Sequence, residues 1–92
     1  IYLVVATFDT KEAAVASAGE LVKKAAEMKF YGIHPEVWSD RPPTDKVVWH
    51  VVEGFSTETI ESNAVPRTEA ALGIRLVPMT SKSFIERTVI DR

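Results

Sequence analysis

The chain has 92 residues, of which 46% are hydrophobic and 26% charged, as is typical of one small globular domain. The net charge of −2 provides no concentrated basic surface for nucleic acid, and no apolar run approaches the roughly 20 residues that span a bilayer. The chain has no cysteine, which excludes disulfides and thiolate metal sites. We expect a single domain, residues 1–92, that binds neither nucleic acid nor membrane.

Two segments are apolar at nearly every position, residues 1–8 (IYLVVATF) and residues 47–52 (VVWHVV). A strand with one face in water alternates apolar and polar side chains, and these two segments do not alternate. Both faces of each strand are therefore expected to be buried. Because so short a chain has few elements with which to cover both faces of a sheet, we expect a second chain or a ligand to cover one of them.

The first helix is expected to follow the first strand at once. Asp9 has the character of an N-cap, and Glu12 three residues later completes a capping box. The helix is predicted over residues 10–29. Its apolar positions recur at helical spacing and are mostly small, which allows close packing on a sheet; they are Ala14, Ala18, Leu21, Ala25 and Met28.

The middle of the chain predicts two strands joined by a stiff loop. The first of them, residues 33–39, is more polar and contains Pro35, which favours an edge position because proline donates no backbone hydrogen bond. The loop is residues 40–45 (DRPPTD), and the next strand is residues 46–54. The sequence leaves open which alternate set of side chains in that strand faces the helices.

The last part of the chain predicts a second helix and a fourth strand. Ser56 or Thr57 is expected to cap the helix, Pro66 to kink or split it, and Gly73 to end it. The strand is predicted over residues 74–80. Residues 81–92 are expected to form a charged tail with at most one short element, outside a core of residues 1–80.

The resulting order, βαββαβ, predicts an α+β ferredoxin-like sandwich. In that fold two helices cover one face of a four-stranded antiparallel sheet, and the first and third strands are central. Those are the two strands with apolar side chains throughout. Burial of the remaining apolar face is then expected through a closed homo-oligomer.

Few side chains suggest a metal or an aromatic binding site. The two histidines, His34 and His50, are too few for a zinc site in a chain without cysteine, so no metal is expected. Trp38 and Trp49 fall on adjacent predicted strands. They either pack in the core or form an aromatic wall for a flat or cationic ligand.

Three acids surround the predicted loop between the second and third strands. Asp40 is expected to serve the turn, as aspartate often does. For Asp45 and Glu53 two roles remain open, turn chemistry or binding of an ammonium or sulfonium group. Thr7 and Phe8 lie where the first strand meets the helix, and there the chain either caps the helix or binds an anion at its N-terminus.

Three stretches resemble the phage-encoded enzymes that degrade S-adenosylmethionine, formerly called hydrolases and now understood as lyases. Residues 2–8 (YLVVATF) are similar to that family's first strand, and residues 76–80 (LVPMT) to its last. Residues 43–46 (PTDK) are similar to a Pro-Thr-acid-acid-Lys run before its third strand, with one acid here in place of two.

The resemblance implies a trimer similar to the trimeric nitrogen-regulatory signal proteins, with active sites between subunits and no cofactor. It implies a metal-independent, anti-restriction lyase in the host cytoplasm that converts S-adenosylmethionine to methylthioadenosine and homoserine lactone. The catalytic candidates are Asp45 and Glu53. The substrate-binding candidates are Thr7, Phe8, Trp38 and Trp49.

A second resemblance is to the sporulation-related repeat, which binds peptidoglycan glycan strands. The small residue and Phe8 that end the first strand and residues 55–58 (FSTE) are similar to that module, although Val4 stands where the family usually has glutamine. A third possibility is an assembly or regulatory module with no catalytic activity, since a fold of this kind does not determine function.

Overall fold

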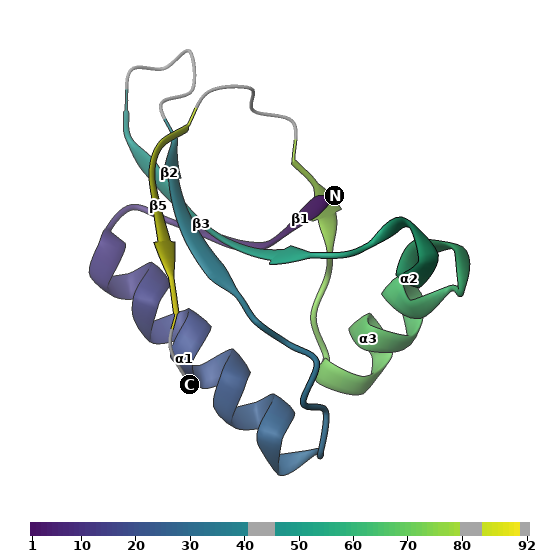
Figure 1. The fold of residues 1–92 in the computed structure, drawn as a ribbon. Helices are drawn as coiled ribbons and strands as arrows, with labels where there is room; N and C mark the ends of the chain where they lie inside the picture. Colours follow the sequence, from purple (N-terminus) through teal and green to yellow (C-terminus); the bar gives the residue numbers. More distant parts are fainter. Residues whose placement is uncertain (41–45, 80–83, 91–92) are drawn as a thin grey trace.

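The computed structural model describes residues 1–40, 46–79 and 84–90. In these ranges it is an α+β fold in which an antiparallel sheet packs against helices (Figure 1). The strands are Tyr2–Phe8 (β1), Glu36–Asp40 (β2), Val48–Gly54 (β3), Val77–Pro78 (β4) and Phe84–Val89 (β5). The helices are Lys11–Glu27 (α1), Thr57–Glu61 (α2) and Ala64–Leu72 (α3).

The sheet has the strand order β4-β1-β3-β2-β5, and every neighbouring pair is antiparallel. β1 and β3 lie inside the sheet, as their apolar sequences predict. The expected four-stranded sheet was wrong, because residues 84–89 of the predicted tail form a fifth strand against β2. The expected edge position of β2 was therefore also wrong. Pro35 precedes Glu36, the first paired residue of β2, so its missing N–H interrupts no bond of the ladder.

Helix α1 begins one residue later than expected. Its N-cap is Thr10 rather than Asp9, and the Thr10 hydroxyl accepts a hydrogen bond from the backbone N–H of Ala13 at 3.2 Å. Four of the five predicted stripe residues are buried. The fifth, Met28, is the C-cap of the helix and is half exposed.

The predicted second helix is split in two, as the proline within it suggested. The Ser56 hydroxyl caps α2 and accepts from the N–H of Thr59 at 3.1 Å. The break comes at Asn63, whose left-handed backbone (φ 63°) turns the chain into α3. Pro66 then lies in the first turn of α3, where its missing N–H costs no intrahelical bond. Gly73 ends α3 with a left-handed φ of 64°, as predicted.

The main core lies between α1 and the sheet, on the side where Figure 1 shows the helix crossing the strands. Small side chains of α1 allow the helix to approach the sheet closely, and Leu72 of α3 closes the same cluster. The Lys24 ammonium group donates to the Leu72 carbonyl oxygen at 2.6 Å and holds α1 against the end of α3. The buried members of this core are Ala14, Ala18, Leu21, Ala25, Ile33, Val37, Val51 and Leu72.

The structure resolves which side chains of β3 face the helices. Trp49 packs against the core beside Val51, so the alternate positions lie on the opposite side of the sheet, called here the open face. The open-face residues of β3 are Val48, His50 and Val52.

The chain covers part of the open face by itself. Val52 is fully buried, although none of the described helices lies on this side of it. Tyr2 on β1 and Trp38 on β2 flank β3, and their rings meet with centroids 4.6 Å apart. Gly54 leaves space for this arrangement, since a Cβ there would lie 3.2 Å from the Tyr2 ring. The expectation that one chain cannot bury both faces of β3 was therefore wrong for Val52.

Candidate functional site

The open face gathers polar and aromatic side chains from β1, β3, β2 and β5. The pairing of β1 with β3 and of β3 with β2 sets Thr7, His50 and Trp38 in one row across the sheet. Glu36, Trp38 and Asp40 alternate along β2 and therefore share this face. The row along β2 thus reads acid, aromatic, acid.

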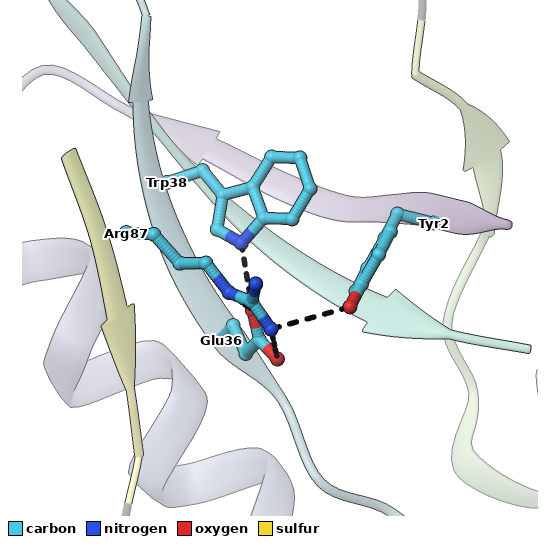
Figure 2. Close-up of polar contacts among 4 residues, drawn as sticks. All are labelled: Tyr2, Glu36, Trp38 and Arg87. Atoms are coloured by element: carbon cyan, nitrogen blue, oxygen red, sulfur yellow. Dashed lines mark hydrogen bonds and ion pairs between the residues drawn. The ribbon is translucent and has the colours of Figure 1, made fainter. Parts of the chain in front are cut away.

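One group of these side chains, the Arg87 cluster, consists of Tyr2, Glu36, Trp38 and Arg87 (Figure 2). The guanidinium of Arg87 meets the Glu36 carboxylate through two contacts, Nε to Oε1 and Nη2 to Oε2, the second at 2.8 Å. The Trp38 indole N–H donates to Glu36 Oε1 at 2.9 Å, and Arg87 Nη2 donates to the Tyr2 hydroxyl at 3.3 Å. The guanidinium lies 5.8 Å from the centroids of both rings, within the range of a cation–π interaction.

Electrostatics favour the charged form of Glu36. The hydrogen bond from Arg87 lowers the pKa of Glu36 below its ordinary value, against the opposing effect of burial, and the Trp38 bond lowers it further. Glu36 in turn raises the pKa of Arg87. The Glu36 side chain is only 13% exposed whereas that of Arg87 is 46% exposed, so the cluster presents its positive partner to solvent.

A second group on the open face is a chain of polar contacts from Thr7 through His50 to Asp40. Thr7 Oγ1 and His50 Nδ1 are 2.8 Å apart, a hydrogen-bonding distance. On the other side of the ring, His50 Nε2 lies 3.6 Å from Asp40 Oδ2, which is longer than a hydrogen bond. Exposure decreases along this chain, because Thr7 is exposed, the His50 side chain is 14% exposed and that of Asp40 is 3% exposed.

Asp40 is the most unusual member of this group. Its second oxygen, Oδ1, is buried and has no hydrogen-bond partner among the residues that the structure describes. A buried carboxylate oxygen without a partner is costly, and an incoming ammonium or other cationic donor would satisfy it. The expected role in a solvated turn was wrong, because Asp40 is the buried last residue of β2.

The sequence could have indicated this site through alternating residues of β2, but the predicted strand was one residue too short. Once β2 is known to reach residue 40, the spacing of Glu36, Trp38 and Asp40 places all three on one face. Placing the end of that strand at residue 39 left Asp40 in the loop. No sequence signal placed Arg87, since its strand was expected to be a tail.

The predicted substrate-binding residues divide between the two faces of the sheet. Thr7 and Trp38 lie on the open face, separated by His50. Phe8 and Trp49 are paired with each other on the helix side, where both pack against the main core. The Lys11 ammonium lies 5.8 Å from the centroid of the Trp49 ring, so this second pair sits near the start of α1.

Of the two predicted catalytic acids, Glu53 and Asp45, the structure describes only Glu53. Glu53 is buried on β3, with both carboxylate oxygens accepting from the backbone N–H of His34 at 3.1 and 3.3 Å. It thereby fixes the segment that leads into β2. Asp45 lies outside the described residues.

Among the residues whose placement the structure describes, no group of three or more histidine, aspartate or glutamate side chains is arranged to hold a metal ion. None of the described helices is both long enough and apolar enough to cross a membrane. Comparisons of the chain with family models, with curated proteins and with solved structures find no match.

Proposed function

We propose that the protein is a lyase that converts S-adenosylmethionine to methylthioadenosine and homoserine lactone on the open face of its sheet. The observation that carries the proposal is the buried Asp40 carboxylate, with one oxygen unpartnered among the described residues and an indole ring two positions away on the same face. The sequence resemblance to phage enzymes of this activity is the second support.

The charges on the open face suit a substrate with two cationic groups and one carboxylate. An ammonium or sulfonium group is stabilised by a carboxylate and by the face of an aromatic ring, and Asp40 and Trp38 supply these. Arg87 is an exposed cation on the same face, and it suits the substrate carboxylate. Each charged group of the substrate thus has a counterpart among Asp40, Trp38 and Arg87.

The proposed reaction requires the protein mainly to orient the substrate. The substrate carboxylate attacks its own γ-carbon, the C–S bond breaks, and the thioether leaves as methylthioadenosine. The electron pair of the C–S bond neutralises the sulfonium, and no proton is transferred. The side chains hold the carboxylate close to the γ-carbon and shield the reacting charges from water, which favours ring closure.

We further propose that the fold is ferredoxin-like and that the chain forms a trimer with sites between subunits, in the cytoplasm where S-adenosylmethionine is made and used. The strand order β4-β1-β3-β2 supports the first proposal, with β5 as an addition. Exposed apolar side chains beside the β1–β4 edge, Ile1 at 67% and Val77 at 45%, support contact with another copy. Sedimentation should show a trimer, and a monomer at all concentrations would contradict the assembly.

The test compares two aspartate variants. Asp40→Asn keeps the shape of the side chain but removes its charge, and we expect the rate of methylthioadenosine formation to fall about tenfold or more. Asp9→Asn is the matched control, because Asp9 is exposed and its ion pair with Lys46, at 3.3 Å, is open to solvent. Equal rates for the two variants, with unchanged circular dichroism, would remove Asp40 from the site.

One observation favours a second function, binding of peptidoglycan glycan strands. Tyr2 and Trp38 place a pair of rings on a sheet face that also carries polar side chains, and sugar rings stack on aromatic side chains. Co-sedimentation with glycan strands that is abolished by Trp38→Ala, together with no turnover of S-adenosylmethionine, would favour this function over the lyase.

A further inference from the structure

The contacts from Thr7 to Asp40 have an order known from hydrolases, in which a hydroxyl meets an imidazole and the imidazole meets a carboxylate. Thr7 Oγ1 lies 2.8 Å from His50 Nδ1, and His50 Nε2 lies 3.6 Å from Asp40 Oδ2. We propose that Thr7 is a nucleophile that accepts the acyl group of activated esters, with His50 as its general base and Asp40 as the positioning residue. This activity shares Asp40 with the proposed lyase site, but it rests on the separate contacts of His50 with Thr7 and Asp40.

The carboxylate determines which nitrogen of His50 can act as the base. A neutral imidazole carries one proton, and the negative charge of Asp40 favours that proton on Nε2, the nitrogen facing it. Nδ1 then presents its lone pair to the Thr7 hydroxyl, which donates to it. The distance of 3.6 Å at Nε2 is long for a hydrogen bond, and we expect it to shorten when the ring becomes positively charged.

Exposure follows the order that the chemistry requires. Thr7 is exposed, so an ester can reach its hydroxyl, whereas the Asp40 side chain is 3% exposed and is shielded from water. The three residues come from β1, β3 and β2, which are neighbours in the sheet. Groups held on adjacent strands keep their relative positions better than groups on loops.

The proposed step is balanced without a cofactor. Thr7 Oγ forms a bond to the carbonyl carbon of the ester while its proton passes to His50 Nδ1. The bond from that carbon to the leaving oxygen then breaks, and the leaving group takes the proton from Nδ1. Water releases the acid from the Thr7 ester in a second step and regenerates the hydroxyl. Small esters of acidic alcohols are the fitting class, since their leaving groups depart readily.

The experiment incubates the whole protein with p-nitrophenyl acetate, quenches it in acid, and locates the acetyl group by peptide mass spectrometry. We expect p-nitrophenolate release with acetyl on Thr7. Thr7→Ser should keep the reaction and Thr7→Val should lose it. Acetyl groups found only on lysine or histidine side chains would overturn the proposal.

Histidine variants separate general-base catalysis from simple exposure of a hydroxyl. His50→Ala should lower the rate of Thr7 acetylation about 100-fold or more, and added imidazole should restore part of it. His34→Ala is the matched control, because His34 is exposed and lies outside the Thr7 row. An unchanged rate of Thr7 acetylation in a folded His50→Ala variant would overturn the role of His50. Loss of S-adenosylmethionine turnover alone would leave this result untouched.

Discussion

Glu36 and Arg87, 51 positions apart in the sequence, join β2 to β5 through two contacts between carboxylate and guanidinium. Trp38 adds a third bond to the same carboxylate, and the Tyr2 hydroxyl a bond to the same guanidinium. The Arg87 cluster thereby connects the C-terminal strand to the open face. The residues of β5 were expected to form a tail. They supply Arg87, an exposed cation of the proposed site.

The ion pair predicts an acid-sensitive contribution to stability. Because Arg87 lowers the pKa of Glu36 in the folded protein, the ionised carboxylate stabilises the fold. This contribution is fully present above the unfolded pKa of about 4.3, and it is lost as the pH falls through the lower folded value. The denaturant midpoint is measured from about pH 6 downward. It should fall less steeply for Glu36→Gln than for the wild type. The exposed Glu20→Gln serves as control, and identical slopes for all three proteins would contradict this reading.

The core between α1, α3 and the sheet predicts a second effect on stability. Leu72 is fully buried in the main cluster, so Leu72→Ala should lower the free energy of unfolding by about 2–5 kcal/mol. Met28→Ala, at a side chain that is 49% exposed, should change it by no more than about 0.5 kcal/mol. Chemical denaturation measures both. A similar loss in the two variants would mean that Leu72 lacks the packing described above.

Glu53 offers a direct comparison between a structural and a catalytic role. Its carboxylate accepts from the His34 N–H, so Glu53→Gln should lower the free energy of unfolding by about 1–3 kcal/mol through a weakened buried bond. Turnover per folded molecule should then stay close to that of the wild type. If the catalytic role predicted from the sequence is the true one, turnover collapses while the unfolding midpoint is unchanged.

Asp45 remains a prediction from the sequence resemblance. If Asp45 binds the substrate ammonium group in place of Asp40, Asp45→Asn should lower S-adenosylmethionine turnover about tenfold or more. The oligomeric state should not change, which sizing chromatography checks. Turnover equal to that of the wild type would remove Asp45 from the mechanism and leave Asp40 as the acid to study.

Much of the framework could be predicted from the sequence, because it depends on local patterns. Continuous apolar segments predicted the interior positions of β1 and β3, and the small-residue stripe predicted the buried side of α1. The helix break before Pro66 and the helix end at Gly73 followed from backbone chemistry. Each of these features is determined by residues close together in the chain.

The site was less predictable, because it depends on pairing between distant segments. Asp40 was assigned to a turn, because the predicted strand ended one residue too early and so left it out of the sheet. The contact of Thr7 with His50 requires the register of β1 against β3, including the irregularity between Val4 and Ala6. Arg87 could be placed at the site only once β5 was known to pair with β2, and no local pattern indicated that strand.

The central claim is most directly tested by incubating the purified protein with S-adenosylmethionine and identifying the products by chromatography. The account predicts methylthioadenosine together with homoserine lactone, formed in proportion to the amount of protein. Unchanged S-adenosylmethionine after prolonged incubation at high protein concentration would contradict it.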